Sequence, residues 1–158
     1  MKRFVTLAWE NEALVLIDQT RLPQVVVHVI CTTPQEVWEA IKMLRVRGAP
    51  AIGVAAAWGV YLGIRNTTVT SFSEFLALFD QVANYLASAR PTAANLVWAL
   101  TRMRQVMHTQ KHAPVTTIQQ ALREEARRIQ AEDEALCHAI GKWGATLIQS
   151  GDRILTHC

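Results

Sequence analysis

The feature that most constrains the fold is a stretch without charge between Arg47 and Arg65, residues 48–64. It consists of alanine, glycine and larger apolar residues, so a helix formed by it carries no charge on any face. A helix that is apolar all round has to be surrounded by other elements. The stretch is shorter than the ~20 apolar residues that span a bilayer. We therefore expect a buried central helix and no membrane span.

Small residues recur along this predicted helix at near-helical spacing. They are Ala49, Gly53, Ala56, Gly59 and Gly63. Glycine inside a helix costs up to about 1 kcal/mol relative to alanine, so several glycines indicate that another backbone passes close by. Such packing would aim the start of the helix rigidly.

The first thirty residues are typical of strands, and the rest of the chain is typical of helices. Three short apolar runs predict an antiparallel meander, at residues 4–9, 13–17 and 25–30, with a turn at 10–12. Helix starts are expected at Thr33-Pro34, at Pro50, at Ser71 or Ser73, at Pro91 and after Pro114. The predicted fold class is α+β, mainly α: a small sheet followed by about five helices.

The last residues differ from the helical region before them. The long helical pattern stops at Ser150-Gly151, and residues 153–157 resemble a strand that needs neighbouring strands to pair with. We expect one domain over residues 1–151. Residues 152–158 are then the first strand of a second, truncated domain.

Charge and cysteine content exclude several classes of protein. The 16 basic and 13 acidic residues leave a net charge of +3 without a basic cluster, which argues against nucleic acid as a partner. The three cysteines form no CxxC pair, which argues against a disulfide framework or zinc site and favours the cytoplasm. Glu10 ends the N-terminal apolar run before it reaches the length of a signal peptide.

Two predicted helix starts carry an arginine and a proline. Arg47, Gly48 and Ala49 precede Pro50, and Arg90 precedes Pro91. Free N–H groups and the positive end of the helix dipole bind anions, and a guanidinium adds bidentate recognition of phosphate. Each start is therefore a candidate phosphate site, although solvated arginines beside ordinary helix starts have the same pattern.

Other reactive side chains have ordinary explanations. Cys31 and Cys137 are typical of buried structural cysteines. His108 and His112 are spaced for one helix face, but a solvated pair explains them and no third metal ligand lies nearby. The acidic run 132–134 is typical of a solvated face, although partial burial of Glu125 and Asp133, paired with Arg127 or Arg128, is an alternative. Cys158 ends the predicted last strand, where reactive groups of parallel α/β sheets lie.

Three strings closely resemble the methylthioribose-1-phosphate isomerase family of methionine salvage. They are LRVRGAPAIGVAAAWG (44–59), ARPTAANLVWALTRM (89–103) and AEDEALCHAIGKWGATLIQSGDRILTHC (131–158). The resemblance implies a cytoplasmic aldose–ketose isomerase that uses neither metal nor cofactor. It implies that Arg47, Gly48, Ala49 and Arg90 bind substrate and that Cys158 is catalytic.

The resemblance also implies what this chain lacks. Family members continue after the cysteine with a Rossmann-like domain that carries a catalytic aspartate and further substrate contacts. We therefore expect residues 1–158 to be inactive alone. The complete form is expected to be a homodimer, or to be completed by a second chain that carries the missing domain.

Two related classes of protein share these motifs. One is the ribose-1,5-bisphosphate isomerases. The other is the regulatory subunits of the initiation-factor exchange complex, which are not catalytic. The blocks NLVWAL and QAEDEALC look closer to the methylthioribose enzymes, and the presence of Cys158 argues against a purely regulatory role.

Overall fold

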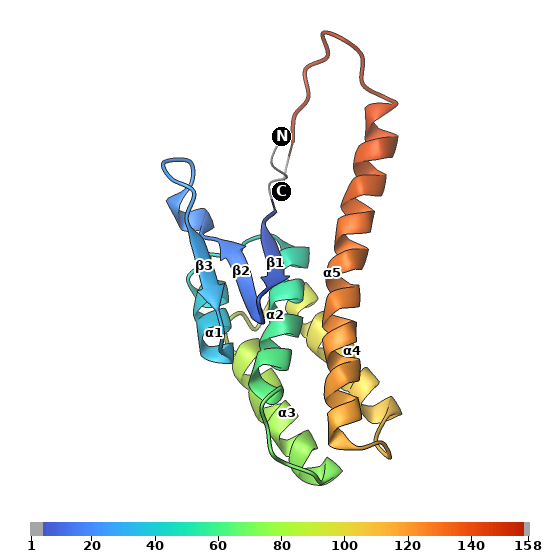
Figure 1. Ribbon diagram of the computed structural model, residues 1–158. Helices are drawn as coiled ribbons and strands as arrows, with labels where there is room; N and C mark the ends of the chain where they lie inside the picture. Colours follow the sequence, from blue (N-terminus) through green and yellow to red (C-terminus); the bar gives the residue numbers. More distant parts are fainter. Residues whose placement is uncertain (1–4, 157–158) are drawn as a thin grey trace.

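A three-stranded antiparallel sheet comes first in the chain, and five helices follow it (Figure 1). The computed structural model describes residues 5–156. The strands are β1 (Leu7–Glu10), β2 (Ala13–Ile17) and β3 (His28–Cys31), in that order across the sheet. The meander predicted from the sequence is confirmed, with the third strand starting at His28 instead of Val25.

The β1–β2 hairpin turns where the sequence predicted, at Asn11 and Glu12. Both residues have positive φ angles, 48° and 59°, the backbone of a tight two-residue hairpin turn. Glu12 then connects the hairpin to the helices. Its carbonyl oxygen accepts a hydrogen bond from Arg65, and its carboxylate lies 2.5 Å from Nη2 of Arg123.

The helices begin at residues that the sequence identifies well in most cases. Their bounds are α1 (Pro34–Lys42), α2 (Ala49–Ile64), α3 (Phe72–Ala87), α4 (Ala94–Thr109) and α5 (Val115–Ala145). Thr33 caps α1 in a capping box with Glu36, and Ser71 caps α3. Both caps follow the sequence-based expectation.

The predicted start of α4 is wrong by three residues. Pro91 lies in a turn, and the helix begins at Ala94. The reason is a local hydrogen bond, in which the N–H of Ala93 donates to the carbonyl of Arg90 at 3.0 Å. Pro91 and Thr92, which the sequence predicted to lie in the first helical turn, form this reverse turn instead.

Helix α2 is the central element, as its lack of charge predicted. It packs against the other four helices and against β1 and β2, and its residues from Ile52 to Leu62 are buried. The glycines allow this packing. A Cβ on Gly53 would lie 2.8 Å from the Asn95 carbonyl oxygen, and one on Gly63 would lie 2.7 Å from a Val82 methyl.

We expect Gly53→Ala to destabilise the protein by about 1 to 3 kcal/mol, because the added methyl would meet backbone that cannot rotate away. Urea unfolding measures the change. Gly141→Ala is the matched control. A Cβ there meets nothing within 4 Å, so alanine should stabilise helix α5 by up to about 1 kcal/mol. Equal effects of the two substitutions would contradict the close α2–α4 packing.

Helix α5 packs along α2 and α4 and then continues past them (Figure 1). After its end at Ala145, residues 152–156 form no helix or strand. The expected division at residue 151 stays a prediction. None of the helices within residues 5–156 has the length and apolar character required to cross a membrane.

Candidate functional site: two helix N-termini

Helices α2 and α4 begin side by side at one end of the bundle (Figure 1). Gly53, in the second turn of α2, closely approaches Asn95, in the first turn of α4. Neither helix has a side-chain cap or an acidic residue in its first turn. By contrast, α1 and α3 have both. No side chain of residues 5–156 therefore caps the first N–H groups of α2 and α4, which leaves them to an anion, except that the N–H groups of Ala93 and Leu96 donate to backbone carbonyls.

The structure places Arg47 and Arg90 just before these two helices. Arg47 is exposed, and its Nε donates to the Leu44 carbonyl at 3.3 Å; Arg90 is half-buried. Among residues 5–156, neither guanidinium forms a salt bridge. Six other arginines in that range do: Arg45, Arg65, Arg102, Arg104, Arg123 and Arg128. Neither guanidinium beside the two helix starts is thus paired with a carboxylate of residues 5–156.

The segment before α2 is held firmly. Arg45 lies 2.5 Å from the buried Asp18 carboxylate and 2.9 Å from Glu39. A hydrogen bond from Thr20, and then the Arg45 guanidinium, hold the pKa of Asp18 below its usual range. These contacts fix the backbone that leads to Arg47.

Glycine is required at position 48 by the backbone conformation and not by a lack of room for a side chain. Its φ angle is 92°, which L residues rarely adopt, whereas a Cβ there would meet only Ala51 at 4.0 Å. Ala49 follows as the first, exposed residue of α2. The combination turns the chain sharply into the helix and leaves the first N–H groups facing outward.

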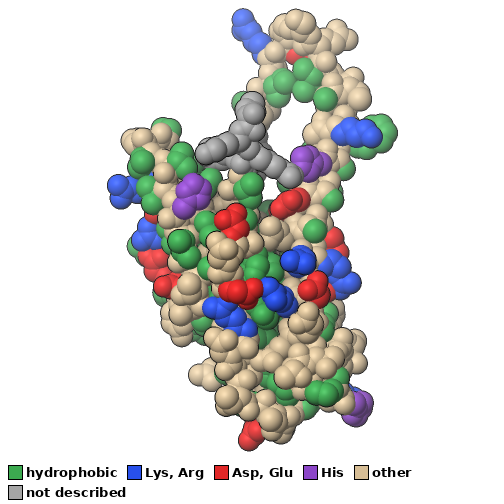
Figure 2. Space-filling view, in the orientation of Figure 1, with side chains coloured by type: hydrophobic (Ala, Val, Ile, Leu, Met, Phe, Trp, Pro, Cys, Tyr) green, Lys and Arg blue, Asp and Glu red, His purple; other side chains and the backbone are tan. Residues whose placement is uncertain are grey.

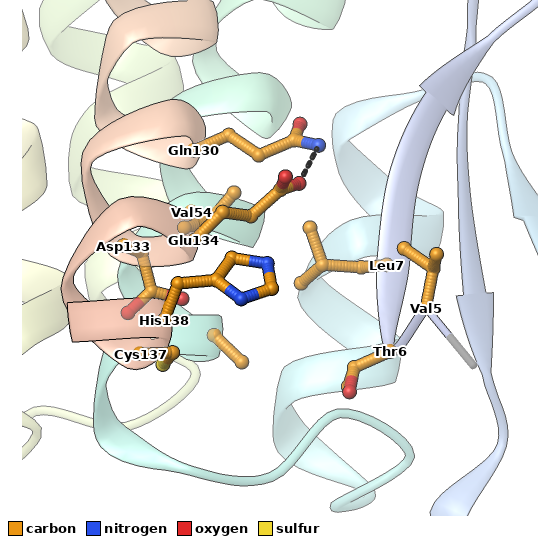
Figure 3. A pocket seen from close by; sticks show the side chains of 10 residues that line it. Val5, Thr6, Leu7, Val54, Gln130, Asp133, Glu134, Cys137 and His138 are labelled. Carbon is orange, nitrogen blue, oxygen red and sulfur yellow. Dashed lines mark hydrogen bonds between the residues drawn. The ribbon is translucent and has the colours of Figure 1, made fainter. Parts of the chain in front are cut away.

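Two open pockets flank the first turns of α2. One, of about 370 Å³, lies between the start of β1 and α5 (Figure 3). There Gln130, Glu134 and His138 extend from α5 toward Leu7, and Gln130 donates to Glu134 at 3.2 Å. The other, of about 250 Å³, lies between α2, α4 and α5 and is lined mainly by apolar side chains. They include Val54, Trp98, Ile129 and Leu136.

Asp133 lines both pockets, although sequence reasoning did not place it among the site residues. Burial, and then the charge of Glu134, raise the pKa of Asp133. The side chain is half-buried and accepts no hydrogen bond from residues 5–156. The partial burial of Asp133 is as the sequence suggested, because it follows Ile129 by one helical turn and so continues the buried face. The suggested pairing with Arg128 is formed by Glu125.

Of the other residues considered in the sequence, Cys137 lines the 370 Å³ pocket, whereas Cys31, His108 and His112 line neither pocket. Cys31 is buried as expected, but Cys137 is exposed, because α5 has left the bundle at that level. His108 and His112 are exposed, and His112 lies beyond the end of α4. No group of three metal-binding side chains exists among residues 5–156. Cys158 lies outside the described residues.

The starts of α2 and α4 lack side-chain caps, and an arginine without a salt bridge to residues 5–156 precedes each of them, which are features that suit an anion. The chain belongs to the Initiation factor 2 subunit family, whose sequence profile matches residues 45–158. That range contains Arg47, Gly48, Ala49 and Arg90.

Individual relatives are named as isomerases and as an initiation-factor subunit. The chain is 49% identical to methylthioribose-1-phosphate isomerase of Symbiobacterium thermophilum, over 94% of this chain and 41% of that protein. It is 45% identical to 5-deoxyribose 1-phosphate isomerase of Bacillus thuringiensis strain Al Hakam, over 99% of this chain and 45% of that protein. The crystal structure of translation initiation factor eIF-2B subunit delta from A. fulgidus superposes with a TM-score of 0.84 at 33% identity, covering 95% of this chain and 43% of that one. The chain thus spans less than half the length of these relatives.

Proposed function

We propose that this chain contributes the phosphate-binding part of a sugar-phosphate isomerase. The substrate would be 5-methylthioribose 1-phosphate or 5-deoxyribose 1-phosphate, the compounds in the names of its relatives. The observation that carries the proposal is the pair of adjacent helix starts with Arg47 and Arg90 and no neutralising carboxylate on either arginine among residues 5–156. A phosphate monoester dianion fits such a site because it accepts several N–H hydrogen bonds at once.

Each side chain then has a chemical role. Arg47 and Arg90, with the N–H groups of Gly48 and Ala49, hold the phosphate. Asp133 lies beside the first turns of α2 and can accept hydrogen bonds from sugar hydroxyls. Cys158 is proposed as the catalytic residue, acting with a further acid–base group. We assign that group to the part of the relatives that this chain does not cover.

The reaction moves hydrogen between C2 and C1 of the sugar, and the product is an isomer. It requires protein groups that transfer protons, placed beside the reacting carbons, and a site that excludes water. In this chain both pockets beside α2 are open. We therefore propose that residues 1–158 do not turn over substrate alone and bind phosphate weakly.

The test joins residues 1–158 to the part of the Symbiobacterium protein that the match leaves out. We expect this fusion to convert 5-methylthioribose 1-phosphate or 5-deoxyribose 1-phosphate to the ketose, measured by a coupled assay, and residues 1–158 alone to show no turnover. Turnover by residues 1–158 that disappears in Cys158→Ser would contradict the need for a further part.

Two other functions remain candidates in the same assay. Ribose 1,5-bisphosphate is included as a third substrate, and preferential turnover of it would change the proposed substrate. The likeness to an initiation-factor subunit favours a role without catalysis as the second alternative. A folded fusion that converts none of the three compounds would support that alternative and contradict the isomerase.

A further inference from the structure

Of the two pockets beside α2, the smaller one, of about 250 Å³, borders both helix starts. Pro50 of α2 and Asn95 of α4 line it, and both lie in the first turns of their helices. The larger pocket borders α2 through Ala51 and Val54 but has no lining residue in α4. A phosphate bound by both helix starts would therefore place the rest of its molecule at the smaller pocket.

The smaller pocket continues along both helices, away from their starts. Val54 lies one turn after Pro50, and Trp98 lies almost one turn after Asn95, which is about 4.5 to 6 Å along the helix axes. In a pentose 1-phosphate, the sugar ring separates the phosphate from the substituent on C5. That substituent can therefore reach Val54 and Trp98 while the phosphate is held at the helix starts.

Trp98 contributes an aromatic surface to the smaller pocket. The Arg102 guanidinium lies over its ring, 5.4 Å from the ring centroid, and donates hydrogen bonds to Glu125 and Glu132 of α5. Trp98 nevertheless remains 49% exposed. An apolar group in the pocket would remove part of this ring from water, and a thioether sulfur would add a favourable contact with it.

Among residues 5–156, acidic side chains line the smaller pocket and basic ones do not. The acidic residues are Glu132 and Asp133. Glu132 forms a salt bridge with Arg102, whereas Asp133 forms none with residues 5–156. Elsewhere too, Lys and Arg side chains lie next to Asp and Glu side chains, as at the centre of the face in Figure 2. A second phosphate in this pocket would meet a carboxylate and no free cation, which is unfavourable.

We propose that the smaller pocket is the specificity site for the substituent on C5 of the sugar phosphate, with Trp98 as its main determinant. The pocket takes an apolar substituent and rejects a second phosphate. This inference rests on the proposed function, because the phosphate on C1 has to be held at the starts of α2 and α4. Of the proposed substrates, 5-methylthioribose 1-phosphate is then bound most tightly, and ribose 1,5-bisphosphate is bound least tightly.

The test measures dissociation constants of residues 1–158 by NMR titration with four compounds that differ at C5. They are 5-methylthioribose 1-phosphate, 5-deoxyribose 1-phosphate, ribose 1-phosphate and ribose 1,5-bisphosphate. We expect the methylthio compound to bind at least about fivefold more tightly than ribose 1-phosphate, because it removes more apolar surface from water. The deoxy compound should lie between these two, and the bisphosphate should bind more weakly than ribose 1-phosphate. The indole N–H signal of Trp98 should shift with the methylthio compound and not with ribose 1-phosphate.

Two variants locate the preference. Trp98→Ala should reduce the advantage of the methylthio compound to less than about twofold, since the aromatic wall is lost, and should leave the dissociation constant of ribose 1-phosphate within about twofold. Trp143→Ala is the matched control, because Trp143 is 69% exposed and lines neither pocket. It should keep the full preference of the unchanged chain.

The possible failures are distinguishable. Equal dissociation constants for the methylthio, deoxy and ribose compounds would overturn the specificity site and leave the phosphate site standing. Tighter binding of ribose 1,5-bisphosphate than of ribose 1-phosphate would overturn the rejection of a second phosphate. No binding of any of the four compounds would contradict the proposed function itself, and the specificity site with it. The titration measures binding without turnover, so an inactive fusion would produce none of these results.

Discussion

Replacing Arg47 and Arg90 together by alanine is expected to lower kcat/KM of the fusion about a hundredfold, and each single replacement at least tenfold. Tenfold corresponds to about 1.4 kcal/mol of lost transition-state stabilisation. The expectation follows from the absence of salt bridges at both arginines within residues 5–156. A guanidinium that already forms a salt bridge with a carboxylate would bind a phosphate more weakly.

The steady-state assay of the fusion measures this effect, and Arg21→Ala is its control. Arg21 is an exposed arginine in the short 3₁₀ turn after β2, and it forms no salt bridge with residues 5–156. Its removal takes away the same charge and should change kcat/KM less than twofold. Unchanged kinetics in both single variants, with the fold intact, would show that the helix starts do not bind the phosphate.

Trp58→Ala is expected to lower the free energy of unfolding by about 3 to 5 kcal/mol, the range for truncating a buried large aromatic residue. Trp58 is 1% exposed and stacks on Trp9 with ring centroids 4.2 Å apart. Its Nε1 donates to the Gln130 side chain at 2.9 Å. One side chain thus joins the sheet, the central helix and α5, and its loss affects all three contacts.

Trp143→Ala is the matched control for this measurement. The same substitution at a side chain that is 69% exposed should change the stability of residues 1–158 by less than about 0.5 kcal/mol. Chemical denaturation of both variants gives the comparison. A loss below about 1.5 kcal/mol for Trp58→Ala would contradict its central position in the core.

The elements most accurately predicted from the sequence have strong local signals. The absence of charge in residues 48–64 identified the central helix, and Thr33 and Ser71 identified two helix starts through their own caps. Pro91 misled because proline is compatible with both a first helical turn and a reverse turn. The hydrogen bond from Ala93 to Arg90 decides between them, and no residue type reveals it.

The site was only partly accessible from the sequence. Arg47 and Arg90 were visible as two separate motifs, but their association depends on contact between helices that are far apart in the chain. The partial burial of Asp133 was suggested by the sequence, but its position beside the first turns of α2 depends on how α5 packs against the other helices. The exposure of Cys137 depends on where the bundle ends along α5, which helical periodicity does not show.

The proposed function requires that the starts of α2 and α4 form one anion site. Amide NMR spectra of residues 1–158 during titration with 5-deoxyribose 1-phosphate test it most directly, with 5-deoxyribose as the uncharged control. We expect phosphate-dependent shifts of the amides of Gly48, Ala49 and Ala51 and of residues 93–96, with one common dissociation constant that rises in Arg47→Ala and in Arg90→Ala. Shifts confined to one helix start, two different dissociation constants, or equal shifts with the uncharged sugar would contradict it.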